Sequence, residues 1–460
     1  MAARPVDFPA VGGTAGSRRF LVAAAAILAV ALAGRVAYVL LTPGYVPVHD
    51  DHAYDLLASA ISRTGVYPLM AHRPTAYRPP GYPYFLAAVY AVTGTGPGRI
   101  QAARLVQAVI GTGIVALLGL LALRLFGRAA AACTMALAAV YPPLIGVGAS
   151  LLSEPQTVLL DLVATLAVVT WRRHPRRRWV VLAGLTAGVL TLTRSNAFVI
   201  VPALALGLWT PRRGSLRRSL GPPLAVIALT VAVVAPWTVR NAVVMHSFIP
   251  VSDETGGTLA GTYNPVSAHD RQAPAYWHLL YQIPQYQAQV APLEGGPEPV
   301  LQSRLLHLAV SYAENHPLYV GKVALYNTLR LLDAESLSGA RYTATLAGIT
   351  YPAMQDATIY GFWVVAVLAA AGATIGAVRR RVPGFVWLQA ALLFLTVVLV
   401  NAETPRLRIP IDPFLLLLAG GAAAAVLKPS AARPLASQGG APASGGGLLG
   451  GNVPVPAEAE

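Results

Sequence analysis

Two adjacent carboxylates near the start of the chain are the residues best suited to acid–base chemistry. Asp50 and Asp51 stand between His49 and His52 in the segment PVHDDHAYD. One of them could serve only as the cap of a short helix, because Asp is favoured at helix N-termini. Two carboxylates flanked by two histidines exceed what a cap requires, and the pattern favours general-base catalysis by Asp50 and Asp51. A bound divalent cation is the alternative chemistry, although we predict neither a metal site nor a required cofactor.

A second group of polar residues suits an anionic ligand near a membrane surface. Arginine binds phosphate through two parallel hydrogen bonds, and tyrosine favours the headgroup region of a bilayer. Ordinary explanations also exist, because an arginine can reach lipid phosphates and Glu154 can start a helix with its carboxylate at the positive dipole end. The candidate binding residues are Tyr77, Arg78, Glu154, Arg194, Arg406 and Arg408.

One further carboxylate lies deeper in the chain's apolar part. Asp161 follows Glu154 by two helical turns on the same face. An ionisable residue at that depth in a membrane is a functional candidate by default. Pairing with Arg104 is the structural alternative.

The composition indicates which kind of protein must position these residues. Of 460 residues, 55% are hydrophobic and 12% charged, and the charged share is about half the ~25% of soluble domains. So few charges argue against a soluble multidomain protein, a disordered chain, a coiled coil or a nucleic-acid-binding protein. The single cysteine excludes an intrachain disulfide framework and a cysteine-based zinc site. The chain is therefore expected to be an all-α polytopic membrane protein.

Ten apolar segments approach the length that a helix needs to cross a bilayer. The spans are expected near residues 20–42, 104–123, 129–148, 155–171, 179–194, 196–210, 219–238, 358–378, 384–401 and 410–427. The fifth and sixth are short and lie close together, so a re-entrant pair is the alternative there. Basic clusters such as RRHPRRR at 172–178 and RRR at 379–381 mark alternate loops as cytoplasmic. With about ten transmembrane helices, both termini then lie in the cytoplasm.

Two longer segments remain on the other side of the membrane. The first contains an amphipathic stretch and then an apolar stretch after Pro79-Pro80, each too short to span. We expect both to be interfacial helices. The predicted divisions are 1–19 as cytoplasmic N-terminus, 20–238 as transmembrane core with the outer loop 43–99, 239–357 as one larger outer loop or subdomain, 358–428 as C-terminal transmembrane helices and 429–460 as disordered cytoplasmic tail.

The candidate residues therefore gather on one side of the membrane. A transporter more often places its polar groups at the midplane, on broken helices. Acids that can take a proton, beside arginines that can hold an anion, fit a reaction on the headgroup of a phosphate-bearing lipid.

Several motifs, taken as a set, resemble the GT-C superfamily of membrane glycosyltransferases. The resemblance is to bacterial relatives of the protein O-mannosyltransferases and of the lipid A aminoarabinose transferase. It covers most of the chain, from about residue 48 to 418. The motifs are HDDHAYDLLASAI, PTAYRPPGYPYFLAAVY, LLSEP, LTRSNA, APWTVRNAVVMHSFIPVSDETGGTLAGTYNP and NAETPRLRIPIDPFLLLLA.

The resemblance implies a GT-C fold, a polyprenyl-phosphate sugar as donor and an active site on the outer face of the bacterial inner membrane. It implies that Asp50 is the catalytic acid–base residue, because Asp50 precedes Tyr54 by the family's spacing. Asp51 stands where many relatives have Glu. Tyr77 and Arg78 stand where the aminoarabinose branch has an acidic residue and Lys, which keeps the cation but puts that sugar in doubt.

The reaction implied is a single displacement that inverts the anomeric carbon. Asp50 takes the proton of an acceptor hydroxyl, and Arg78 with Arg406 or Arg408 holds the leaving phosphate. The sugar can be a hexose or a pentose, and the acceptor a lipid, a glycan or a protein. Acceptor recognition is expected in the second outer segment, without roles for single residues. The alternatives are a lipid-linked-sugar flippase or transporter and a non-enzymatic membrane assembly factor.

Overall fold

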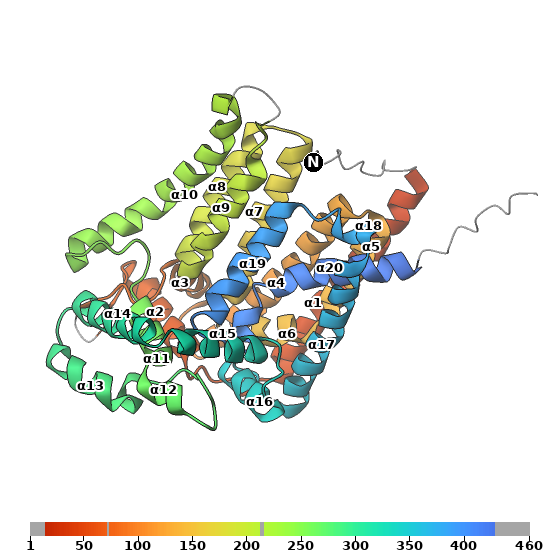
Figure 1. Cartoon of the computed structure of the whole chain (residues 1–460). Helices are drawn as coiled ribbons and strands as arrows, with labels where there is room; N and C mark the ends of the chain where they lie inside the picture. Colours follow the sequence, from red (N-terminus) through yellow and green to blue (C-terminus); the bar gives the residue numbers. More distant parts are fainter. Residues whose placement is uncertain (1–13, 71–72, 212–215, 428–460) are drawn as a thin grey trace, which may run out of the picture.

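The computed structural model describes residues 14–70, 73–211 and 216–427, and this part of the chain is almost entirely helical (Figure 1). Within it, the strands β1 (Leu69–Met70) and β2 (Arg73–Pro74) form one antiparallel pair. The all-α class is thus confirmed. The tail predicted at 429–460 and most of the N-terminal segment 1–19 lie outside the described residues.

The apolar helices build one bundle around a shared core. Alanine, leucine and valine side chains of distant segments fill it, including Leu118, Ala164, Leu204 and Leu417. The elements of this bundle and its first outer segment are α1 (Thr14–Leu41), α2 (Asp50–Thr64), α3 (Gly81–Thr93), α4 (Arg99–Leu125), α5 (Arg128–Val140), α6 (Pro142–Gly148), α7 (Glu154–Arg173), α8 (Arg177–Thr193), the 3-10 helix η1 (Ser195–Val199), α9 (Ile200–Leu208), α10 (Leu216–Met245), α17 (Pro352–Thr374), α18 (Gly376–Arg379), α19 (Gly384–Val398), the 3-10 helix η5 (Arg406–Arg408) and α20 (Asp412–Leu427).

The second outer segment folds into shorter helices with an aromatic core of their own. Tyr263, Tyr286 and Tyr319 are buried there with aliphatic neighbours. Figure 1 shows these helices at the same end of the bundle as α2 and α3. They are α11 (Thr255–Thr262), α12 (Pro265–His269), the 3-10 helices η3 (Leu280–Gln282) and η4 (Ala291–Leu293), α13 (Pro284–Val290), α14 (Glu298–Asn315), α15 (Pro317–Leu331) and α16 (Leu337–Leu346).

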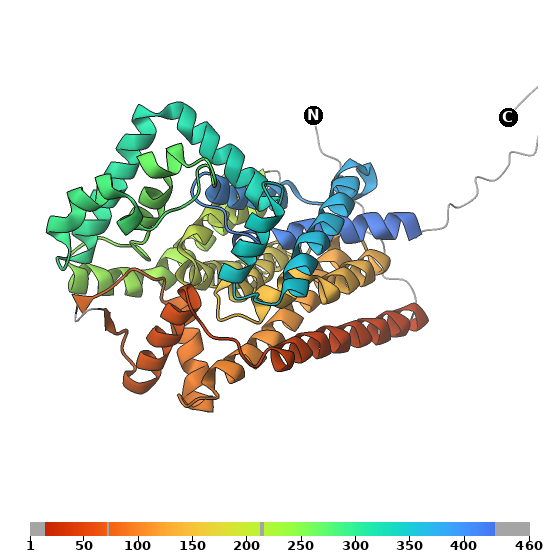
Figure 2. The same cartoon turned by 90° about the horizontal axis from the view of Figure 1, so that it is seen from below.

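The number of full-length spans in the described residues is smaller than expected. Four helices, α1, α4, α10 and α17, are long and apolar enough to cross a membrane, or five spans if α5 and α6 form one bent span. The count of about ten is therefore not confirmed. A 15-residue helix such as α19 reaches only about 22 Å against a hydrocarbon core of ~30 Å. The protein is nevertheless a multi-pass membrane protein, with α1 along one edge (Figure 2).

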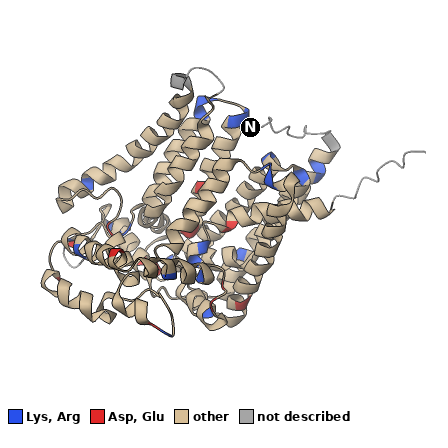
Figure 3. Ribbon diagram, viewed as in Figure 1, with Lys and Arg blue, Asp and Glu red and all other residues tan. Residues whose placement is uncertain are grey.

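The charged residues are distributed unevenly along the bundle. Figure 3 shows basic residues at the top and at the right of the bundle, around the end of α7, the start of α8, the start of α1 and the end of α18, and others lower in the view. The acidic residues lie in the middle and lower parts of the same view. This distribution has the direction expected from the sequence, in which the loops rich in Lys and Arg face the cytoplasm.

The two short helices expected in the first outer loop are α2 and α3, and they pack against each other. Helix α2 buries Tyr54, Leu57 and Ile61 and exposes Leu56. It ends at Gly65, whose φ of 71° is the left-handed conformation that glycine tolerates best. The pair therefore presents the start of α2, with Asp50, to the interior of the molecule.

Two arginines within the bundle donate hydrogen bonds to backbone carbonyls. Arg35 donates to the carbonyls of Ala138 and Ala139 at 3.1 and 3.0 Å, where α5 ends before α6. Arg104 donates to the carbonyl of Ala149 at 2.7 Å. Helix ends leave carbonyls without partners, and a buried guanidinium has enough donors to satisfy them.

Asp161 does not pair with Arg104, contrary to the structural alternative for this residue. Its carboxylate accepts hydrogen bonds from the amide of Gln389 at 3.0 Å and the hydroxyl of Thr165 at 3.3 Å. Arg104 had no need of a carboxylate because backbone carbonyls already surround it. Asp161 therefore joins α7 to α19 through uncharged partners.

Candidate active site

Asp50, the first residue of α2, lies between two guanidinium groups. Its carboxylate is bound by Arg406, with Nη2 2.5 Å from Oδ2, and by Nη2 of Arg78. Burial alone would raise the pKa of Asp50, but Arg406 and Arg78 hold that pKa well below its usual range. The empty site therefore contains an ionised carboxylate with two cationic partners.

Arg406 connects Asp50 to a second, fully buried carboxylate. Glu154 starts α7, and its Oε1 accepts hydrogen bonds from Arg406 Nε and Arg194 Nη1, both at 2.7 Å. Its other oxygen has no hydrogen-bond partner among the described residues. Glu403 lies 3.9 Å from Arg406 on the remaining side. Three of the predicted binding residues, Glu154, Arg194 and Arg406, thus meet Asp50 in one cluster.

Arg78 has a partner that the sequence did not single out for the site. Its Nη1 lies 3.0 Å from Oε2 of Glu254, which directly precedes α11 in the second outer segment. The Arg78 guanidinium also lies 5.1 Å from the ring centre of Tyr77 and 5.8 Å from that of Tyr54. The sequence placed Glu254 in the motif APWTVRNAVVMHSFIPVSDETGGTLAGTYNP, in the segment expected to recognise the acceptor, and gave it no role beside an arginine.

Asp51 is turned away from the arginines. Its carboxylate accepts hydrogen bonds from the backbone N–H groups of Val48, His49 and His52 at 2.8–3.0 Å and from the hydroxyl of Tyr45. These contacts hold the chain where α2 begins, as a capping carboxylate does. The structure therefore does not bring Asp51 to the anion-binding side of Asp50.

Arg408 also lies apart from the Asp50 cluster. It forms ion pairs with Asp333 at 2.6 Å and Asp412 at 3.4 Å, and its guanidinium covers the ring of Phe362 at 3.5 Å. Both carboxylates are buried with it. Of the predicted arginines, Arg78, Arg194 and Arg406 are thus brought to Asp50, whereas Arg408 is not.

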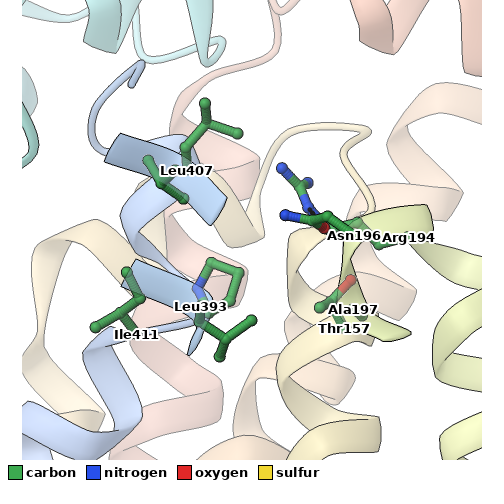
Figure 4. A pocket seen from close by; sticks show the side chains of 9 residues that line it. Thr157, Arg194, Asn196, Ala197, Leu393, Leu407 and Ile411 are labelled. Carbon is green, nitrogen blue, oxygen red and sulfur yellow. Dashed lines mark hydrogen bonds between the residues drawn. The ribbon is translucent and has the colours of Figure 1, made fainter. Parts of the chain in front are cut away.

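A small, mostly apolar pocket with room for about one water molecule adjoins the cluster. Figure 4 shows Arg194 and Asn196 on one side of it and Leu393, Leu407 and Ile411 on the other. The remaining lining residues are Thr157, Ala197, Val397 and Pro410. A guanidinium thus lies beside apolar side chains here, but the pocket is too small to hold a hydrocarbon chain.

No group of three or more His, Cys, Asp or Glu residues in the described part of the chain is arranged to hold a metal ion. The acids that might have joined Asp50 have other partners. Asp55 pairs with Arg99 at 2.7 Å and accepts a hydrogen bond from Tyr90.

The central part of the chain matches a known family. Residues 77–239 match the family described as dolichyl-phosphate-mannose-protein mannosyltransferase. The family resemblance is confirmed. The matched segment contains three members of the cluster, Arg78, Glu154 and Arg194, while Asp50, Glu254 and Arg406 lie outside it. No match was found among curated protein sequences.

Two solved oligosaccharyltransferase structures share the fold. The apo oligosaccharyltransferase of Archaeoglobus fulgidus superposes with a TM-score of 0.52 at 13% identity, over 88% of this chain and 50% of that one. The same organism's AglB, in complex with an inhibitory peptide and a dolichol-phosphate, gives 0.50 at 13% identity over 90% and 51%. ArnT from Cupriavidus metallidurans bound to undecaprenyl phosphate gives 0.40 at 16% identity over 90% and 77%. The chain thus spans about half the length of the oligosaccharyltransferases, and identities this low show the fold alone.

Proposed function

We propose that the protein is an inverting glycosyltransferase that moves a sugar from a polyprenyl-phosphate donor to an acceptor hydroxyl. The observation that carries this proposal is the position of Asp50, an ionised carboxylate between Arg78 and Arg406. A base and cationic groups for a leaving phosphate are two parts that such a transfer needs.

The donor binds with its phosphate among the arginines. Arg78, Arg194 and Arg406 supply guanidinium donors for the phosphate oxygens, and the apolar side chains beside Arg194 contact the first units of the polyprenyl chain. Glu154 keeps Arg194 and Arg406 in register, because both donate to the same oxygen. Tyr77 lies beside Arg78 and limits the directions in which its guanidinium can turn.

The transfer is a single displacement at the anomeric carbon. Asp50 accepts the proton of the acceptor hydroxyl while the hydroxyl oxygen forms a bond to that carbon. The bond between the carbon and the phosphate oxygen breaks, and the polyprenyl phosphate leaves with the electron pair. One attack from the face opposite the phosphate inverts the configuration. The guanidinium groups stabilise the negative charge that develops on the phosphate.

The reaction takes place at the outer face of the bacterial inner membrane. The donor carries a hexose or a pentose, and the acceptor is a lipid, a glycan or a protein. A flippase is less well supported, since the deep arginines Arg35 and Arg104 are bound to backbone carbonyls rather than exposed along a polar path. No observation favours a non-enzymatic assembly factor.

Isosteric replacement of the two adjacent acids tests the proposal. Asp50→Asn removes the base, and we expect transfer from a radiolabelled polyprenyl-phosphate sugar in vesicles to fall by about a thousandfold. Asp51→Asn is the matched control, because it alters only the contacts at the start of α2, and transfer should fall less than about tenfold. Full activity of folded Asp50→Asn would contradict the catalytic role of Asp50.

A further inference from the structure

Glu254 has a single guanidinium partner in the cluster, Arg78, whereas Asp50 and Glu154 each have two. Glu403 also has one, Arg406, at 3.9 Å. The Glu254 side chain is 21% exposed, close to the 23% of Asp50, while that of Glu154 is fully buried. On Arg78, Glu254 is therefore easier to displace than Asp50, because breaking one ion pair costs less than breaking two.

The Glu254 carboxylate bridges two parts of the proposed phosphate site. One oxygen faces Nη1 of Arg78 at 3.0 Å, and the other accepts a hydrogen bond from the hydroxyl of Ser195 at 3.1 Å. Ser195 stands between Arg194 and Asn196, which line the apolar pocket. Glu254 thus links Arg78 to the segment that lines the pocket.

In this geometry the Glu254 carboxylate and a donor phosphate compete for the same side of the Arg78 guanidinium. Its Nη2 is bound to Asp50, and its Nη1 is bound to Glu254. A phosphate that approached Nη1 would lie beside the Glu254 carboxylate, and like charges at that distance repel each other. The phosphate must replace Glu254 to use this donor.

The chain around Glu254 is held in place independently of the ion pair. The neighbouring Asp253 donates its backbone N–H to the carbonyl of Ala76 at 3.2 Å. Glu298 of α14 accepts hydrogen bonds from the backbone N–H of Ala76 at 2.8 Å and the hydroxyl of Thr75 at 2.7 Å. The second outer segment thus remains attached to the first when the Glu254 side chain turns away.

We propose that Glu254 occupies the place of the donor phosphate on Arg78 while the site is empty, and that the polyprenyl phosphate displaces it on entry. This inference rests on the proposed function. In this inference the Glu254 carboxylate, from the second outer segment, competes with the phosphate for Arg78. The competition makes the phosphate-bound state less favourable relative to the phosphate-free state, and it therefore favours release of the polyprenyl phosphate after transfer.

The test is the affinity of the full-length protein in nanodiscs for undecaprenyl phosphate. Glu254→Gln removes the competing charge and keeps the shape, and we expect binding to become about tenfold tighter. Ser195→Ala loosens the hold on Glu254 without changing the charge of the cluster, and tightening of about two- to threefold is expected. The matched control is Asp253→Asn, which removes the adjacent acid that faces Glu298 instead of Arg78. All variants are measured at pH 8, where the Asp253 carboxyl, whose pKa is about 7, is mostly ionised, and the affinity of Asp253→Asn should equal that of the wild type.

The outcomes separate this inference from the proposed function. Unchanged or weaker binding by folded Glu254→Gln overturns the displacement, because a mere support of Arg78 would give that result. Equal tightening in Asp253→Asn also overturns it, since the effect would then be one of general charge. A wild-type protein that neither binds undecaprenyl phosphate nor transfers sugar refutes the proposed function and, with it, the displacement.

Discussion

Arg406 and Arg408 stand two positions apart on η5, yet they belong to different kinds of ion cluster. Arg406 faces Asp50 and Glu154, and its side chain is 11% exposed. Arg408 faces Asp333 and Asp412, and its side chain is 2% exposed. In a 3-10 helix successive residues are rotated by about 120°, so positions i and i+2 point in different directions.

The two clusters differ in how far their charged groups are enclosed by other side chains. The Arg406 cluster adjoins an apolar pocket and contains the partly exposed Glu254. The Arg408 cluster is closed by the ring of Phe362 and by buried carboxylates. Arg408 thus fixes η5 to α20 and to the segment after α15, and this attachment holds Arg406 in position. Two arginines of one motif can therefore serve stability and ligand binding separately.

The largest effect is expected from Arg408→Met. The substitution leaves Asp333 and Asp412 buried without a cation, and we expect the free energy of unfolding to fall by about 3–5 kcal/mol. Unfolding in mixed micelles measures this change. Adding Asp333→Asn and Asp412→Asn should restore part of the stability, because neutral side chains need no cation. If Arg408→Met were as stable as the wild type but had lost sugar transfer, Arg408 would serve ligand binding and not stability.

Arg406→Lys should affect activity rather than stability. Lysine keeps the charge but cannot contact Asp50 and Glu154 with separate donors of one planar group, as Arg406 does. We expect kcat/KM for transfer to fall about a hundredfold, while the free energy of unfolding changes by less than ~1 kcal/mol. Arg341→Lys, at an exposed ion pair with Asp356, is the control and should retain activity. A large loss of stability in Arg406→Lys would show that the Arg406 cluster, like the Arg408 cluster, serves stability.

The sequence predicted those features that depend on short stretches of chain. The two helices of the first outer loop were predicted from their length and from the prolines before Gly81, and they are α2 and α3. The residue types that meet at the cluster, including Asp50, Arg78 and Arg406, were also predicted, because these residues lie in the outer segments and in the motifs that resemble the GT-C superfamily. Local patterns and these motifs were sufficient for these predictions.

Partners distant in the sequence could not be predicted in this way. Arg78 and Glu254 are 176 residues apart, and Arg408 and Asp333 are 75 apart. No periodicity relates such positions, and only the packed helices bring them together. The number of spans was not confirmed for a related reason, since hydropathy does not reveal how far a short helix such as α19 reaches into the bilayer.

The smallest expected effect is a pH dependence of stability caused by Asp253, which directly precedes Glu254 of the Arg406 cluster. Burial, and then the nearby charge of Glu298, raise the pKa of Asp253 from 3.8 to about 7. The folded protein therefore binds more protons than the unfolded chain between these values, and the stability that Asp253 contributes is lost as pH rises through this window. Because the side chain is partly exposed, we expect a loss of only about 1 kcal/mol between pH 5 and pH 8.

Asp253→Asn should abolish this part of the pH dependence. The neutral amide has no charge to bury at high pH, so the variant should be more stable than the wild type at pH 8 and of similar stability at pH 5. Thermal unfolding in nanodiscs at the two values measures the difference. A wild type that gains stability from pH 5 to pH 8, with no change of slope in Asp253→Asn, would show that Asp253 is ionised throughout. Asp253, next to Glu254 of the Arg406 cluster, would then carry a charge at every pH tested, which would contradict the raised pKa.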